Sequence, residues 1–109
     1  MRKRKSEVPK YSSYALVTGA AGGMGRIYAE ALAKRGYNLL LVDINRDGLA
    51  ETDTLIRQTV KELYPDNAEC GFETLVIVQD LSEQDAAEKI FGEAESHRCI
   101  VDVLVNNAG

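Results

Sequence analysis

A glycine-rich segment at residues 19–25 constrains the fold of this chain more than any other feature of its sequence. The apolar run Tyr14–Thr18 precedes it and predicts a buried strand. Apolar residues then recur at spacings of three and four, which predicts a helix whose buried face is made of Met24, Ile27, Tyr28, Ala31 and Leu32. A strand that leads through a glycine turn directly into a helix is an arrangement suited to binding phosphate groups.

The alternation of strand and helix continues along the chain. Apolar runs predict three more strands, over Asn38–Asp43, Thr74–Val78 and residues 100–105. Two amphipathic stretches lie between them, with predicted buried faces made of Leu49, Ile56, Val60 and Leu63 in the first and of Ala86, Ala87, Ile90, Phe91 and Ala94 in the second. Four strands and three helices in the order βαβαβαβ predict an α/β fold, a Rossmann-like doubly wound parallel sheet.

Local signals also predict where the second and third helices begin. Asn45 or Asp47 can cap the second helix, because a side-chain oxygen at this position accepts from unpaired backbone N–H groups. Ser82, with Asp85 three residues later, has the spacing of a capping signature for the third helix.

Length and charge bound the classes of function. A chain of 109 residues holds one domain, which we place at residues 13–109 as an incomplete dinucleotide-binding Rossmann domain after a basic, flexible leader at residues 1–12. The first ten residues carry five basic side chains and one acidic one, whereas the rest carry 8 basic and 16 acidic side chains. An acidic body is unsuited to nucleic acid, and no apolar run approaches the roughly 20 residues of a membrane span.

The cysteines and the N-terminus bear on the compartment and on metal binding. Cys70 and Cys99 are too few and too far apart in sequence to predict a disulfide framework or a zinc site, so we expect no metal. No apolar stretch of a secretory signal follows the basic start. We therefore expect a cytoplasmic protein whose cysteines remain thiols.

Asp43 adds a second requirement for a nucleotide site. It ends the second predicted strand, where a carboxylate can accept hydrogen bonds from both hydroxyls of an adenosine ribose, although it could instead cap a turn. A 2′-phosphate would meet like charge there, which favours NAD over NADP, while Arg26 and Arg46 lie near enough in sequence to soften that preference. The hypothesis requires the carboxylate to face the glycine turn and the amides of that turn to be unpaired.

Three short motifs carry a resemblance to a known family. The segment Thr18-Gly19-Ala20-Ala21-Gly22-Gly23-Met24-Gly25 resembles the T-G-x-x-x-G-x-G fingerprint of the short-chain dehydrogenase/reductase family. Asp80-Leu81 resembles the adenine-contacting dipeptide of that family, and Asn106-Asn107-Ala108-Gly109 matches its N-N-A-G element. The motifs occur in the family's order on the expected elements and span residues 14–109.

The resemblance implies a cofactor site and roles for its residues. Gly19, Gly23 and Gly25 would shape the diphosphate turn, Asp80 would accept from the adenine amine, and Asn106 would help to hold the sheet together. Capping of the next helix is the alternative for Asp80, and strand-end bonding is the alternative for both asparagines. The full implied set of cofactor-binding residues is Gly19, Ala21, Gly22, Gly23, Met24, Gly25, Asp43, Asp80, Leu81, Asn107, Ala108 and Gly109.

The family's catalytic residues have no counterpart in this sequence. The family uses a Ser and a Tyr-x-x-x-Lys that follow N-N-A-G, and none of the five tyrosines here has Lys four residues later. His97 lies near the predicted end of the third helix, where a cation is favourable to the helix dipole, so we do not expect it to replace them. We expect no catalytic residue in these 109 residues and no reductase activity from them alone.

Two functions compete on these grounds. The first is the cofactor-binding N-terminal part of an NAD(P)-dependent oxidoreductase that interconverts a small carbonyl and alcohol substrate and is a homo-oligomer in its full-length form. The second is a dinucleotide-binding or interaction module without catalysis. A methyltransferase also uses a glycine loop and an acidic strand end, but it does not account for Asn106-Asn107-Ala108-Gly109.

The fold of the family also makes a prediction about the fourth strand. In the family's strand order this strand is central, whereas in a four-stranded sheet it would be an edge with exposed apolar residues. Exposed edges of this kind favour association, so we expect the 109-residue chain to be marginally soluble or to form dimers through it.

Overall fold

The structure, a computed structural model, describes residues 11–65 and 71–108. Residues 1–10 of the predicted leader, Cys70 and Gly109 lie outside the described residues. The elements follow the predicted alternation: β1 (Tyr14–Thr18), α1 (Gly23–Lys34), β2 (Asn38–Asp43), α2 (Arg46–Leu63), β3 (Thr74–Val78), α3 (Ala86–Ser96) and β4 (Val101–Val105).

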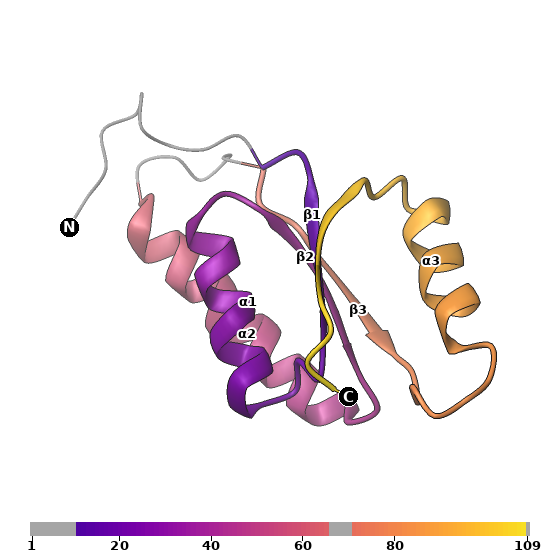
Figure 1. Cartoon of the computed structure of the whole chain (residues 1–109). Coiled ribbons are helices and arrows are strands. Elements are labelled where there is room, and N and C mark those ends of the chain that lie inside the picture. The colour runs from indigo at the N-terminus through magenta and orange to yellow at the C-terminus, as the bar shows by residue number, and fades with distance from the viewer. Residues whose placement is uncertain (1–10, 66–70, 109) are drawn as a thin grey trace.

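The four strands form one parallel sheet in the order β3-β2-β1-β4. Helices α1 and α2 cover one face of this sheet and α3 lies on the other, as Figure 1 shows. This arrangement confirms the predicted Rossmann-like fold. Because the strands are parallel, their C-terminal ends lie at one edge of the sheet. After β1 the chain continues to β2 on one side of β1, whereas β4 lies on the other side of β1. Such a change of direction creates a crevice suited to a ligand.

The two central strands are buried on both faces. Every residue of β1 is buried, and only Asp43 of β2 is partly exposed. Side chains alternate along each strand, so Ala15 and Val17 pack in the cluster beneath α1 and α2, whereas Leu16 packs with Ile90 of α3. Consecutive apolar residues are therefore needed here, which explains why these strands could be predicted from apolar runs.

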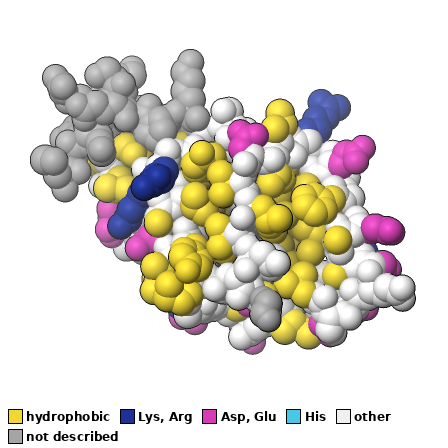
Figure 2. All heavy atoms as spheres, viewed as in Figure 1, with side chains coloured by type: hydrophobic (Ala, Val, Ile, Leu, Met, Phe, Trp, Pro, Cys, Tyr) yellow, Lys and Arg dark blue, Asp and Glu magenta, His cyan; other side chains and the backbone are white. Residues whose placement is uncertain are grey.

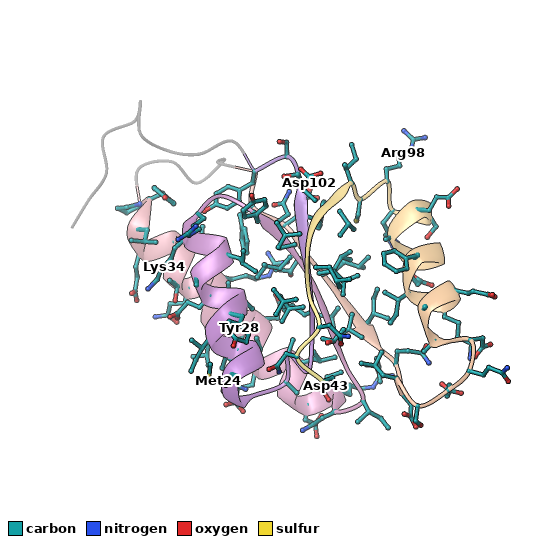
Figure 3. All side chains as sticks on the ribbon, viewed as in Figure 1. Met24, Tyr28, Lys34, Asp43, Arg98 and Asp102 are labelled. Carbon is teal, nitrogen blue, oxygen red and sulfur yellow. The ribbon has the colours of Figure 1, made fainter. Side chains whose placement is uncertain are left out.

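The predicted buried face of α1 is wrong. Met24 is 51% exposed, Ile27 is 59% exposed and Tyr28 is 40% exposed. Figure 3 places Met24 and Tyr28 on the outward side of the helix, and Figure 2 shows hydrophobic side chains gathered on this face of the molecule. Ala31 is exposed too, and of the predicted face only Leu32 packs partly against the core.

Small residues form the real buried face of α1. The buried positions are Gly25, Ala29 and Ala33, spaced four residues apart, so they lie on one side of the helix. Their small side chains let the helix axis approach the sheet closely, whereas larger residues would hold it away. The sequence contains two stripes at helical spacing, and the stripe of small residues faces the sheet.

The predicted helix starts were right for α2 and wrong for α3. Asn45 is the N-cap of α2, and its side chain accepts a hydrogen bond from the Gly48 amide at 3.0 Å. Helix α3 begins only at Ala86 after a turn, with Asp85 at the N-cap, because the Ser82 hydroxyl donates to Asp80 instead. In the predicted buried face of α2, Leu63 is only half-buried. The buried face of α3 is also narrower than expected, since Phe91 is 48% exposed and Ala87 is exposed.

Strand β4 is an edge of the sheet, as predicted. It pairs with β1 on one side, and no described strand pairs with its other side. Its residues are alternately half-buried and exposed, and Leu104 is 58% exposed. This strand therefore presents both unpaired backbone groups and apolar side chains.

We expect the 109-residue chain to self-associate through β4, because an exposed edge pairs readily with another strand. The average mass measured by sedimentation should rise with concentration, and Leu104→Lys should reduce that rise by placing a charge on the edge. A chain that stays monomeric at high concentration would contradict this prediction.

The packing of α1 predicts a position-dependent effect of one substitution. Ala29→Leu should lower the free energy of unfolding by roughly 1–3 kcal/mol, because the larger side chain has no space between helix and sheet. The same change at exposed Ala31 is the matched control and should change it by less than about 0.5 kcal/mol. Urea unfolding measures both, and equal effects would show that the assigned buried face is wrong.

Candidate functional site

The predicted site residues lie at the C-terminal edge of the sheet. The glycine turn joins the end of β1 to the start of α1, Asp43 ends β2, and residues 106–108 follow β4. Asp43 and Met24 lie at the same end of the molecule in Figure 3. The fold therefore brings the glycine turn together with residues from the two neighbouring strands.

Gly25 lets α1 start directly against the end of β1. A Cβ atom at this position would overlap the backbone carbonyl of Gly19 and would lie 3.0 Å from Asn107 Nδ2. Any larger residue would therefore push the first turn of the helix away from the strand. This close approach holds the start of α1 beside the residues that follow β4.

Two amides of the glycine turn are bonded within the protein. The Ala20 amide donates to the Val42 carbonyl at 3.1 Å, and the Ala21 amide donates to Asp43 Oδ2 at 3.0 Å. The amides that follow, at Gly22 and Gly23, have no partner among the described residues, and no side chain caps α1. Nothing lies within 4 Å of where a Cβ would stand at either glycine. The requirement for unpaired amides is therefore met at the start of the helix but not throughout the turn.

These features fit a diphosphate group. The first amides of a helix lack carbonyl partners and carry a partial positive charge, so an anion is stabilised there. The open space beside Gly22 and Gly23 lets such a group approach the backbone closely. No acidic residue lies in the first turn of α1 to repel it.

Asp43 faces the glycine turn, as the hypothesis requires. One carboxylate oxygen accepts from the Ala21 amide, and the other accepts from the Asn45 amide at 3.0 Å. Asp43 thus stabilises the turn, which is the role given above as the alternative to ribose binding. A carboxylate has about four acceptor positions, so two remain for the hydroxyls of a ribose.

Arg26 bonds to α2 and to the carbonyl side of the glycine turn, and no ion pair joins it to Asp43 among the described residues. Its guanidinium donates to Thr52 Oγ1 at 2.8 Å and to the Ala21 carbonyl at 2.7 Å. It also forms an ion pair with Glu51 at 3.0 Å. Arg46 is the first residue of α2 and is exposed.

Thr18 joins β1 to the segment after β4, and sequence reasoning did not assign it a role. Its hydroxyl oxygen accepts from the amides of Asn107 at 2.9 Å and Ala108 at 3.1 Å. It lies 3.3 Å from Asn106 Oδ1, to which it can donate, in keeping with the structural role expected of Asn106. Asn107 Nδ2 also reaches the Gly19 carbonyl at 3.5 Å. The signal that could have identified Thr18 is its place as the first residue of the fingerprint, at the end of the first strand.

Asp80 organises the turn after β3 rather than capping α3. Its Oδ1 accepts from both the amide and the hydroxyl of Ser82, at 2.9 and 2.7 Å. These hydrogen bonds, the hydroxyl's first, lower the pKa of the Asp80 carboxyl below its ordinary value. Leu81 lines a cavity of about 340 Å³ together with Thr18 and Asn106, so the turn after β3 borders the same end of the sheet.

Tyr14 does not have the properties of a catalytic acid–base group. Burial, and then the hydrogen bond to Glu73, raises the pKa of Tyr14. A tyrosine that serves as a catalytic acid–base group needs the opposite shift. His97 is the C-cap residue of α3, as expected, with Nδ1 lying 2.9 Å from the Glu93 carbonyl oxygen.

Over residues 11–65 and 71–108, no group of three or more His, Cys, Asp or Glu side chains is placed to hold a metal ion. No helix of this part of the chain combines the length and the apolar character needed to cross a bilayer.

Comparisons with known proteins agree on one family for this chain. The model of the short chain dehydrogenase family matches residues 13–109. A diacetyl reductase of the (S)-acetoin-forming type from Staphylococcus epidermidis is 37% identical over 98 residues. That match covers 90% of this chain and 34% of the reductase, so the chain spans about a third of the length of this relative.

Solved structures with the same fold carry either nicotinamide cofactor. The actinorhodin polyketide ketoreductase with NADPH superposes with a TM-score of 0.72 and 31% identity, over 90% of this chain and 33% of the ketoreductase. A short chain dehydrogenase/reductase from Burkholderia phymatum in complex with NAD has a TM-score of 0.69 and 26% identity, over 87% of this chain and 30% of its own.

The contacts of Asp80 predict a measurable pKa change. In Ser82→Ala the hydroxyl donor is lost, so the pKa of Asp80 should rise towards its ordinary value. Because the folded pKa is depressed, the small stabilisation from this contact is present above the unfolded pKa and is lost as pH falls through the folded one. An NMR titration of the carboxyl carbon measures the shift, and an unchanged pKa would contradict the assigned cause.

Proposed function

The chain belongs to the short-chain dehydrogenase family, and on that premise we propose that residues 13–109 are the part of an oxidoreductase that binds a nicotinamide dinucleotide. The observation that supports this most strongly is the pairing pattern of the glycine turn. The carbonyls of Ala20 and Ala21 are bonded to the protein, whereas the amides of Gly22 and Gly23 have no partner among the described residues. Open space lies where a Cβ would stand at either glycine.

Each part of the dinucleotide has a proposed set of residues. The amides from Gly22 to Gly25 would hold the diphosphate, with Gly19, Ala21 and Met24 completing the turn. Asp43 would accept from the adenosine ribose, and Asp80 with Leu81 would contact the adenine. Asn107 and Ala108, with Gly109 beyond the described residues, would line the second ribose.

The residues of this chain would bind and orient the cofactor, which would supply or accept the hydride when bound. No residue of the sequence matches the Ser and Tyr-x-x-x-Lys that the family uses for proton transfer. The contribution of these 109 residues is therefore positional: the turn would fix the diphosphate, and the carboxylate would fix the attached sugar.

We propose that NAD is preferred over NADP. A 2′-phosphate would lie against the Asp43 carboxylate, and like charges at such short range repel. Arg26 would not offset this repulsion, since its donors are directed to Thr52, Glu51 and the Ala21 carbonyl. Of the two arginines near this site in the sequence, Arg46, exposed at the start of α2, is the one left to attract the extra phosphate.

For the whole protein we propose the reaction indicated by the family, the interconversion of a small carbonyl compound and its alcohol. Relatives such as the diacetyl reductase of Staphylococcus epidermidis support a carbonyl substrate. We also propose a cytoplasmic location and a homo-oligomeric full-length form.

Calorimetric titration with NAD and NADP tests the proposed site. The chain should bind NAD more tightly than NADP, and Asp43→Asn should narrow that preference by about tenfold, because it removes the charge while keeping the size of the side chain. Asp43→Ala should also weaken NAD binding about tenfold, since ribose acceptors are lost.

Asp102→Asn is the matched control for the test at Asp43. This exposed carboxylate lies on β4 at the opposite end of the sheet, as Figure 3 shows, so its loss should leave both affinities unchanged. Failure of the unmodified chain to bind either dinucleotide would refute the proposed function. If the unmodified chain binds a dinucleotide but Asp43→Asn leaves the ratio of NAD to NADP affinity unchanged, only the role of Asp43 is refuted.

A further inference from the structure

We propose that Arg26 and Thr52 are positioning residues for the diphosphate turn, holding its carbonyl groups against α2 so that its amides face a nucleoside diphosphate. This inference rests on the proposed function, because it assigns a cause to the orientation of the turn. Neither residue belongs to the three family motifs that predicted the site.

The carbonyl groups of two successive residues in the turn accept hydrogen bonds from these side chains. Thr52 Oγ1 donates to the Ala20 carbonyl at 2.7 Å, and Arg26 Nη2 donates to the Ala21 carbonyl at 2.7 Å. The two side chains are also joined, since Arg26 Nε donates to Thr52 Oγ1 at 2.8 Å. The turn is thus bonded to a connected pair of side chains from α1 and α2.

Peptide planarity converts these contacts into an orientation of the amides. In a trans peptide the C=O and the following N–H point in opposite directions, and the described chain has no cis peptide bond. The Ala20 carbonyl points to Thr52, and the Ala21 amide of the same peptide points to Asp43. By the same geometry, the Ala21 carbonyl on Arg26 directs the Gly22 amide away from α2, to the open side of the turn.

Helix α2 is shaped to receive the turn at this place. Thr52 is fully buried, and Gly48 lies one helical turn before it on the same face. A Cβ atom at Gly48 would lie 2.7 Å from the Ala21 side chain and 2.9 Å from its carbonyl oxygen. The Gly48 carbonyl also accepts from Arg26 Nη2 at 3.4 Å. The close contact between α2 and Ala21 is therefore built from both helices.

Arg26 acts through the turn and not by touching the ligand. Its donors are directed to Thr52, Glu51 and the carbonyls of Ala21 and Gly48, all on the α2 side. The ion pair with Glu51 involves a carboxylate whose side chain is 67% exposed, and such pairs contribute little. The contacts that matter are those to Thr52 and the Ala21 carbonyl, which a neutral or shorter side chain could not reproduce together.

The experiment compares the affinity for ADP-ribose with that for adenosine, measured by calorimetry on the whole chain. The first probe carries a diphosphate and a second ribose that adenosine lacks, so the ratio of affinities reports what these groups contribute, and a change of the ratio in a variant that alters only the turn reports on the diphosphate. Arg26→Leu should lower this ratio about tenfold, because the Gly22 amide is no longer held towards the ligand. The affinity for adenosine should stay within about twofold.

Thr52 supplies a matched pair in case Arg26→Leu does not fold, which thermal unfolding followed by circular dichroism would reveal. Thr52→Val keeps the shape but removes the hydroxyl, and should lower the ratio; Thr52→Ser keeps the hydroxyl and should preserve it. Glu51→Gln and Arg57→Leu are controls. The first removes the exposed ion pair, and the second removes an arginine whose side chain bonds, among the described residues, to Asp53 and Thr74. Both should leave the ratio unchanged.

The possible outcomes separate this inference from the function on which it rests. An unmodified chain that binds ADP-ribose no better than adenosine would refute the diphosphate site itself. If the unmodified chain has a high ratio of ADP-ribose to adenosine affinity and Arg26→Leu or Thr52→Val preserves that ratio, the positioning role is overturned and the proposed site remains. A ratio lowered in these variants, but not in Thr52→Ser and the two controls, would establish it.

Discussion

The close approach of α1 to the end of β1 is the constraint on which the other features of the site depend. It exists because Gly25 has no side chain, so the first helical turn can lie against the Gly19 carbonyl and beside Asn107. The small residues Ala29 and Ala33 continue the same close contact down the helix. A helix held this near to the sheet places its unpaired N-terminal amides directly above the C-terminal edge, where a ligand can reach them.

Around that contact, the protein separates the two polar sides of the glycine turn. Thr52 and Arg26 donate hydrogen bonds to the carbonyls of Ala20 and Ala21, and Asp43 accepts one from the Ala21 amide. The amides of Gly22 and Gly23 have no partner among the described residues. On the β4 side of the turn, Thr18 holds the segment after β4 by accepting hydrogen bonds from the amides of Asn107 and Ala108. Three neighbouring segments therefore hold one short turn, and the groups without a partner are those that suit an anion.

Much of the fold could be predicted because its signals are local. Strand bounds followed from apolar runs, since β1 and β2 are covered on both faces, and Asn45 was recognisable because a cap contacts a residue only three positions away. The predicted start of α3 was wrong because Ser82 satisfied a local pattern but bonds Asp80. The orientation of α1 was wrong because two stripes have the same helical spacing, and packing against the sheet selects the smaller one.

The motifs, with the carboxylate that ends β2, contain the residues proposed to touch the ligand, but not Arg26 and Thr52, which hold the turn. Thr18 is the first residue of the fingerprint, but its contacts, like those of Thr52, join residues far apart in the sequence, such as Thr52 with Ala20 and Thr18 with Ala108. No periodicity or short spacing reports such contacts. The sequence placed Arg26 near the 2′-position of the ribose, but it could not show that the donors of Arg26 bond to Thr52 on α2 and to the Ala21 carbonyl.

The proposed site requires the amides of Gly22 and Gly23 to bind a diphosphate while those of Ala20 and Ala21 are already engaged. An NMR titration of the ¹⁵N-labelled chain with ADP-ribose tests this requirement at single amides. We expect large shifts at Gly22 and Gly23, at the start of α1, and smaller shifts at Ala20 and Ala21. Amides of Gly22 and Gly23 that stay unchanged while the ligand binds elsewhere would contradict it.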